Sequence, residues 1–374
     1  MNLTIRWSNQ MTVTRINIGP IHPSTHGVLR LVVDLDGDTI VNVEPHVGFL
    51  HRGVEKLVET RMYMQCPPYM EKLDYVAPMS YDEAYVSVIE KAQGIEVKER
   101  AMYVRTVMLE LERIASHLLW LGSMSNDLGQ FFTLFMWAFR DRDTVLRLLE
   151  EAAGGRMFYV NMRLGGVVKD IPDGFAEKAS AALQQVEKHT HEYEVYLEKN
   201  PVFNERMKGV GVLSRELAIS LGVTGPVLRG SGVSYDVRKN NPYYVYDKLN
   251  FRMQTRRDGD SFGRYMVRLL EIRESIRLVR EALRKMPAGD AIGMPIRLVM
   301  PIPKNMTAVT NRELPRGECM MYLVADKQRP YRLSIRAPNF INLSAIGEMA
   351  KGHHTADLFT ILGSLDIVMG DVDR

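Results

Sequence analysis

Apolar residues recur at every third or fourth position through much of the middle of the chain. The clearest segment is Glu96 to Leu119, where this spacing predicts a long and mostly buried helix. Asn126 and Gly129 interrupt the pattern, and a second helix is expected to run through a Phe-rich stretch to Glu151. Asp127 is therefore expected at the junction of two helices.

Two more segments have the helical spacing. They are Asp173 to Glu198 and Phe262 to Lys285. In the second segment Arg and Glu recur at four-residue steps, a pattern typical of a charged face that is exposed to solvent. Together these segments predict a helical bundle in the centre of the chain.

The two ends of the chain show the shorter period of strands. Thr12 to Gly19 and Leu29 to Val43 alternate or run apolar with β-branched residues, and Asp36-Gly37 is a hairpin signal within the second stretch. Near the C-terminus two strand-like runs, Glu318 to Val324 and Tyr331 to Ile335, precede a short helix and an apolar tail. A small β layer at the N-terminus is therefore expected.

These elements predict an α+β protein with a central helical bundle, a small N-terminal β layer and a C-terminal α+β segment. With 374 residues the chain is longer than a single core usually grows, which is about 250–300 residues. The predicted parts are residues 1–50, residues 51–290 and residues 291–374, packed together as one compact unit.

Composition excludes several classes of protein. The net charge of +3 comes from nearly balanced acidic and basic residues, and no basic stripe for nucleic acid stands out. The first residues lack the pattern of a signal peptide, so a cytoplasmic location is expected. The most apolar stretch, Phe131 to Phe139, is far shorter than the ~20 residues of a membrane-spanning helix. Membrane association is thus expected only through partners. Cys66 and Cys319 are expected to be unrelated thiols.

Several short motifs carry a resemblance to a known family. Gly19 to Arg30 reads GPIHPSTHGVLR and Gly48 to Lys56 reads GFLHRGVEK. They resemble the catalytic D subunit of NADH:quinone oxidoreductase, or complex I, and its counterpart in archaeal reduced-deazaflavin dehydrogenases. The resemblance covers essentially the whole chain, and the short segment from Pro301 to Leu314 leans toward the archaeal form. The other matching segments are ELERIASHLLWLG (Glu110 to Gly122), LRGSGVSYDVRK (Leu228 to Lys239), RAPNF (Arg336 to Phe340) and DVDR (Asp371 to Arg374).

The His-Arg-Gly motif is also similar to that of nickel-iron hydrogenase large subunits, which implies the same fold. Those subunits bind their metals through two pairs of cysteines. Here the corresponding segments, 71–76 and 366–371, contain no cysteine. Because nickel and iron in such sites need soft thiolate ligands, hydrogen activation and a metal site in this chain are not expected.

The resemblance implies a site for the headgroup of a quinone, or of a phenazine of similar shape. It implies that His26 and Tyr75 donate protons and that Asp127 orients or recharges the histidine. This chemistry fits, because histidine titrates near neutral pH and a tyrosine hydroxyl is a neutral hydrogen-bond donor. The implied acceptor-binding residues are His22, Pro23, Ser24, Thr25, His26, Gly27 and Tyr75.

The resemblance also implies that the electrons come from elsewhere. The chain has no cysteine set for a cluster and no Gly-rich nucleotide loop, so no cofactor is expected in it. The iron-sulfur cluster is expected in an adjacent small subunit (NuoB type), and Arg52 and Phe158 are expected to face it. Phe158 stands where most bacterial and mitochondrial members have histidine. Further expected partners are a NuoC-type subunit and a membrane-arm subunit (NuoH type), at the cytoplasmic face of the membrane.

Other interpretations remain open from the sequence. His22 and His26 have the spacing of a metal pair, but Pro23 and the flanking glycines favour a loop. Glu110, Arg113 and His117 share one helix face and are interpreted first as a structural polar network and second as a proton route. The whole chain could also be a docking subunit without an acceptor site. The electron donor, whether NADH, reduced deazaflavin or ferredoxin, is not determined by the sequence.

Overall fold

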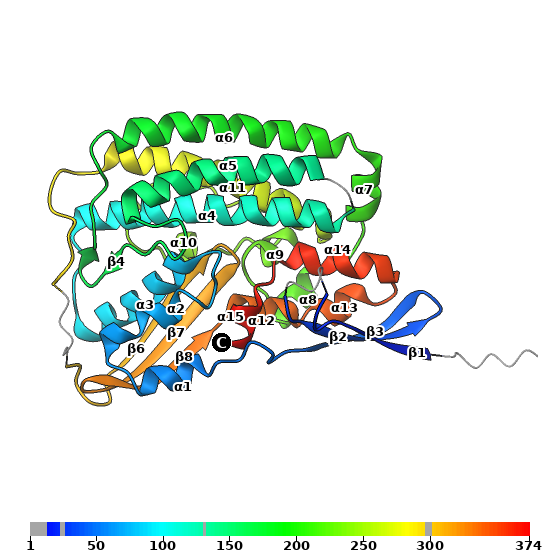
Figure 1. Ribbon diagram of the computed structural model, residues 1–374, viewed down its shortest axis with the longest axis horizontal. Coiled ribbons are helices and arrows are strands. Elements are labelled where there is room, and N and C mark those ends of the chain that lie inside the picture. The colour runs from blue at the N-terminus through cyan, green and yellow to red at the C-terminus, as the bar shows by residue number, and fades with distance from the viewer. Residues whose placement is uncertain (1–12, 23–26, 130–131, 296–300) are drawn as a thin grey trace, which may run out of the picture.

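Four long helices lie side by side and form the largest layer of the protein (Figure 1). The computed structural model describes residues 13–22, 27–129, 132–295 and 301–374. The bundle consists of α4 (Glu99–Asp127), α5 (Phe132–Ala153), α6 (Phe175–Glu198) and α11 (Ser261–Lys285). The predicted helices are therefore confirmed, with α4 running eight residues further than its apolar pattern. Asp127 is the last residue of α4, as expected for a helix junction.

The charged residues in the first half of α11 are buried, whereas Arg277 and Lys285 in the second half are 31% and 42% exposed, so the predicted exposed face covers only the second half of the helix. Arg264, Arg268 and Glu271 are at most 2% exposed. Arg268 donates to the backbone oxygens of Ser364 and Leu365, and Glu271 pairs with Arg229. A four-residue step of Arg and Glu fits a solvated face and a buried ion-pair network equally well, and here the partners lie on other elements.

A three-stranded antiparallel sheet lies beside the bundle. Its strands are β6 (Thr307–Leu314), β7 (Gly317–Asp326) and β8 (Arg329–Arg336), in that order. β7 and β8 contain the two predicted strands, whereas β6 was not predicted. Helices α1 (Val54–Glu59) and α3 (Pro78–Gln93) pack against this sheet (Figure 1). A two-residue turn joins β6 to β7 and carries Arg316.

The predicted N-terminal β layer is confirmed as a second three-stranded antiparallel sheet. It consists of β1 (Val13–Ile18), β2 (Arg30–Asp36) and β3 (Thr39–His46). The helices α13 (Ile346–Ala350) and α14 (Thr355–Leu365) share a buried apolar cluster with it. Because α14 also contacts α4 and α11, it lies between this sheet and the bundle (Figure 1).

Shorter elements connect these layers, and the predicted α+β class is confirmed. Their bounds are η2 (Tyr63–Gln65), α2 (Pro67–Met70), β4 (Met162–Arg163), β5 (Gly166–Val167), α7 (Pro201–Met207), α8 (Arg215–Ser220), α9 (Gly225–Gly230), α10 (Val237–Asn240), α12 (Pro338–Leu343) and α15 (Met369–Asp373). None of the helices within these described ranges is long and apolar enough to cross a membrane.

Candidate acceptor site along one helix

The loop that follows β1 docks on α14 through His22. The rings of His22 and Phe359 stack, with their centroids 5.2 Å apart and their planes 10° from parallel. The backbone of His22 also pairs with that of Gly27, which brings the two ends of the loop together. The predicted residues Pro23, Ser24, Thr25 and His26 lie outside the described residues.

Asp127 approaches the same helix from the bundle. A methyl group added at Gly363 would lie 3.5 Å from Oδ2 of Asp127 and 3.0 Å from the sulfur of Met124. The missing side chain at Gly363 therefore lets the end of α4 come close to α14. Trp120 fixes this approach by donating from Nε1 to the backbone oxygen of Gly363 at 2.8 Å. Burial raises the pKa of Asp127 to about 7, so its carboxyl can exchange a proton near neutral pH.

Tyr75 lies in the loop between α2 and α3, and its side chain is half exposed. The residue before it, Asp74, is buried and accepts hydrogen bonds from the backbone of Val76 at 3.0 Å and Ala77 at 3.2 Å. Asp74 also accepts from Arg316 at 2.8 Å. Burial, with the negative charge of Asp74, raises the pKa of Tyr75, so the hydroxyl stays protonated as a donor.

Arg316 connects the Tyr75 loop to the C-terminal end of α14. Its Nη2 donates to Oδ1 of Asp366 at 3.1 Å and its Nε donates to the backbone oxygen of the same residue at 3.1 Å. Asp366 directly follows α14 and takes the left-handed conformation. Asp74 and Asp366 are thus held on opposite sides of one buried guanidinium, which fixes the position of Tyr75.

Two of the three contact points lie on one face of α14, and the third directly follows the helix. Phe359 and Gly363 stand at positions i and i+4, and Asp366 is the residue after the last residue of the helix. The structure therefore brings His22 and Asp127 to α14, and Arg316 links the loop of Tyr75 to the residue that follows this helix. Sequence reasoning found these three residues but missed Arg316, Asp366 and Gly363.

Arg52 and Phe158 both contact Lys72. Nη2 of Arg52 donates to the backbone oxygen of Lys72 at 3.0 Å, and the ammonium of Lys72 lies 5.0 Å from the centre of the Phe158 ring. Lys72 is three residues before Tyr75. The two residues expected to face a cluster thus share one surface next to the site, and the facing itself stays a prediction.

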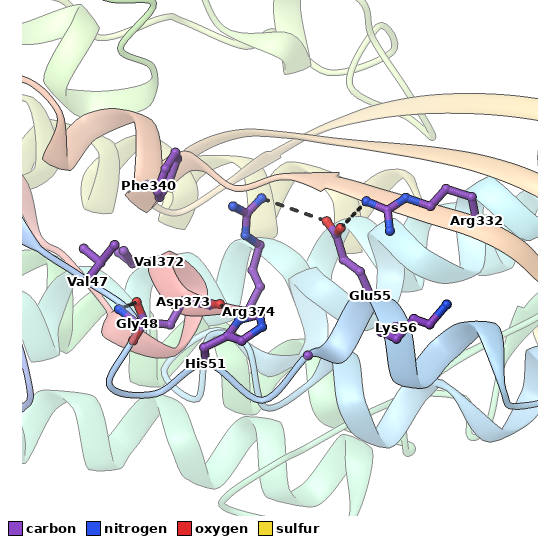
Figure 2. A pocket seen from close by; sticks show the side chains of 11 residues that line it. Val47, Gly48, His51, Glu55, Lys56, Arg332, Phe340, Val372, Asp373 and Arg374 are labelled. Carbon is purple, nitrogen blue, oxygen red and sulfur yellow. Dashed lines mark hydrogen bonds and ion pairs between the residues drawn. The ribbon is translucent and has the colours of Figure 1, made fainter.

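A pocket of about 350 Å³ lies beside this surface, between the His-Arg-Gly motif and the C-terminus (Figure 2). Glu55 reaches Arg332 at 2.8 Å and Arg374 at 4.0 Å. The carboxylate of Asp373 accepts from the backbone of Gly48 at 2.7 Å and of Leu50 at 2.6 Å. Two of the motifs that carry the family resemblance therefore contact each other directly.

Glu110, Arg113 and His117 lie in a buried polar network, which supports their structural interpretation. Glu110 accepts from Ser275 at 2.6 Å and from Arg238 at 3.1 Å. Burial lowers the pKa of His117 to about 4, so its ring is neutral near pH 7.

Within the described ranges, no group of three or more His, Cys, Asp or Glu is arranged to hold a metal ion. Both thiols, Cys66 and Cys319, are buried and free. Burial raises the pKa of Cys66 to about 11, which keeps it a thiol. His353 lies close to the backbone of Gly211, whereas the adjacent His354 is mostly exposed, so the two rings do not form a ligand pair.

Comparison with known proteins identifies the class to which this fold and site belong. The family model described as "Respiratory-chain NADH dehydrogenase, 49 Kd subunit" matches residues 127–310 and 298–374. The chain belongs to this family.

Relatives that are named as the D subunit of NADH-quinone oxidoreductase match nearly the full length. That of Dehalococcoides mccartyi strain 195 is 45% identical over 96% of this chain and 98% of its own length. That of Geotalea uraniireducens is 43% identical over 97% of this chain and 99% of its own. That of Carboxydothermus hydrogenoformans is 45% identical over 96% and 98%.

Proposed function

We propose that this chain forms, with a small iron-sulfur partner subunit, the site at which a quinone is reduced and protonated. The observation that carries the proposal is that His22 and Asp127 meet α14, while Arg316 links the loop of Tyr75 to the end of the same helix. The name of the relatives supports quinone as the acceptor class. A quinone takes up two electrons and two protons, so its site needs hydrogen-bond donors that reach both ring oxygens.

Tyr75 is the donor to one quinone oxygen. Its half-exposed side chain is accessible to a ligand, while Asp74 and Arg316 hold its loop from behind. Its raised pKa keeps the hydroxyl protonated until the acceptor oxygen becomes negative. His26 is the donor to the other oxygen, and Asp127 favours the charged form of that histidine and returns a proton to it.

The electrons arrive from the cluster of the partner subunit, which supplies them one at a time. Arg52 and Lys72 are two cations on the surface next to Tyr75, and such charges fit a negatively charged cluster and raise its reduction potential. A phenazine is the second acceptor class, because its ring nitrogens accept hydrogen bonds from the same donors. In the complete complex the NuoC-type and NuoH-type subunits attach the chain to the cytoplasmic face of the membrane, where acceptor reduction drives proton pumping.

The test uses the Tyr75→Phe variant in the assembled complex. The variant keeps the ring and removes one donor, a loss that costs ~10²–10³ in rate where water is excluded. Because Tyr75 is half exposed, we expect a fall of about tenfold in acceptor reduction, with assembly intact. The matched control is Tyr331→Phe, which changes a more exposed tyrosine on β8.

Cluster reduction by the natural donor is measured in the same membranes and should be unchanged. The acceptor is identified by extracting the lipid-soluble fraction of the purified complex. If the Tyr75→Phe complex reduces the acceptor as fast as the Tyr331→Phe complex, Tyr75 has no part in the site. That result would favour the interpretation of the chain as a docking subunit.

A further inference from the structure

The N-terminal half of α3 contains a buried carboxylic acid without a hydrogen-bond partner among the described residues. Asp82 is 1% exposed, and neither of its carboxyl oxygens has a hydrogen bond within the described part of the chain. Two other acids on the same helix are equally buried but paired, Glu83 with Arg312 at 2.7 Å and Glu90 with Arg105 at 2.7 Å. Asp82 therefore differs from its neighbours, since no cation of the described ranges pairs with it to stabilise its charge.

A second buried acid, Glu112 of α4, lies at the start of α3. It is fully buried and accepts from the backbone of Met79 and of Ser80 at 2.8 Å each, and it also contacts the hydroxyl of Ser80. Asp74 caps the same helix end through Ala77. Asp74 and Glu112 thus bind backbone amides at the start of α3 that are two to three residues apart in the sequence. This separation corresponds to about 3–5 Å at the rise of a helix.

The hydroxyl of Tyr159 completes the group. Tyr159 is 3% exposed, and its hydroxyl has no hydrogen bond within the described ranges. The charged groups that act on it are Glu112, Arg142, Asp74 and Arg316. Tyr159 is therefore near both Glu112 and the ion pair that holds the Tyr75 loop.

Burial raises the pKa of both acids. Burial, followed by the negative charge of Glu71, raises the pKa of Asp82 well above its usual range. Burial raises the pKa of Glu112 to about 8, although three hydrogen bonds act in the opposite direction. The charged groups that act on Asp82 are Glu71, Arg105, Glu83 and Glu112. Glu71, whose charge acts on Asp82, is 15% exposed and paired with Lys72, so it lies on the side of Asp82 that is nearest to solvent among these groups.

We propose that Asp82, Glu112 and Tyr159 form an internal proton relay that resupplies Tyr75 after each acceptor reduction. Buried polar groups without protein partners are the usual positions of internal water, which would bridge the gaps between them. Stability alone does not account for the group, because an unpaired buried polar group costs ~1–3 kcal/mol that an apolar residue would avoid. The proposal rests on the proposed function and deepens it.

The proton transfers balance at every step. Tyr75 gives its proton to the reduced acceptor, and the resulting phenolate takes a proton passed along from Glu112 by way of water and the Tyr159 hydroxyl. Glu112 then takes the proton of Asp82, and Asp82 is reprotonated from solvent at Glu71. In each step one O–H bond breaks and one forms, and no electrons move.

The decisive variant is Tyr159→Phe in the assembled complex. It removes a hydroxyl that makes no hydrogen bond within the described ranges, so a merely structural role predicts no loss. Tyr265→Phe is a matched control, since Tyr265 on α11 is equally buried and its hydroxyl has no partner there either. We expect turnover of Tyr159→Phe to fall about tenfold with KM unchanged and with a larger solvent deuterium isotope effect.

Asp82→Asn is the second variant, because asparagine keeps the shape but holds no transferable proton. We expect the same kinetic pattern, and we expect infrared difference spectra on acceptor reduction to lose a carbonyl band of a protonated carboxylic acid. Wild-type spectra without such a band would overturn the relay even if a variant failed to assemble.

The outcomes separate the relay from the proposed function. If Tyr75→Phe slows the complex while Tyr159→Phe and Asp82→Asn match Tyr265→Phe, the relay is wrong and the acceptor site stands. If Tyr75→Phe also has no effect, the proposed function fails with it.

Discussion

Replacing Arg316 by methionine should destabilise the chain far more than replacing Arg332, although each arginine binds two carboxylates. Arg316 is 2% exposed and pairs with Asp74 and Asp366 at 2.8 and 3.1 Å. Arg332 is 46% exposed and pairs with Glu55 and Glu59 at 2.8 and 3.4 Å. The two sites differ mainly in burial.

The magnitudes follow from that difference. Two charges about 4 Å apart attract with ~4 kcal/mol at an effective dielectric constant of 20, and removing one partner of a buried pair typically costs ~3–5 kcal/mol. Arg316→Met leaves two buried carboxylates facing each other, so we expect a loss within that range. Arg332→Met should cost ~0–1 kcal/mol, because solvent screens exposed pairs.

The loss should also depend on pH. Burial already raises the pKa of Asp366 above its ordinary value of 3.8, and removing Arg316 should raise it further. An acid with a raised pKa gives stability that is full below 3.8 and is lost as pH rises through the folded value. The loss in Arg316→Met should therefore be smaller at pH 5 than at pH 8.

The assay is urea unfolding of the purified chain by circular dichroism, compared with wild type at both pH values. Equal losses in the Arg316 and Arg332 variants, or a loss that does not change with pH, would refute the view that Arg316 neutralises two buried carboxylates.

Two other predictions concern the site and its support. Asp127→Asn should mimic His26→Ala in part and should remove an inflection near pH 7 from the rate of acceptor reduction. The double variant should be little worse than the poorer single one, and strictly additive losses would show that the two residues act separately. Gly225→Ala should destabilise the chain by ~1–3 kcal/mol more than Gly94→Ala in urea unfolding, because both glycines have positive φ but only at Gly225 would a methyl meet the backbone of Arg316, at 2.5 Å. Equal losses would mean that the backbone shifts freely there.

The elements that depend on neighbouring residues in the sequence could be predicted. α4 follows from apolar residues at three- and four-residue steps, and Asp127 marks the break between α4 and α5. The hairpin between β2 and β3 follows from Asp36 and Gly37. These features depend on neighbours in the sequence, where the pattern carries the information.

The sequence does not predict which residues far apart in the chain pair with each other. The partner of Asp74 is Arg316, 242 residues away, and Arg316 is placed by the turn between β6 and β7. β6 itself was missed, since its run of Thr, Asn, Arg and Glu is polar for a strand half of whose residues are buried. The buried face of α11 was missed for the same reason, because its partners lie on other elements.

The family resemblance supplied the identities of the candidate site residues, and the structure explains how one helix can serve all three. Asp366 gives α14 a fixed end through Arg316, and Gly363 gives the end of α4 its close approach. The stacking of His22 on Phe359 attaches the loop that follows β1 to the same helix. A change in the position of α14 would therefore move all three contacts together, so the relative positions of His22, Asp127 and Tyr75 depend on this helix.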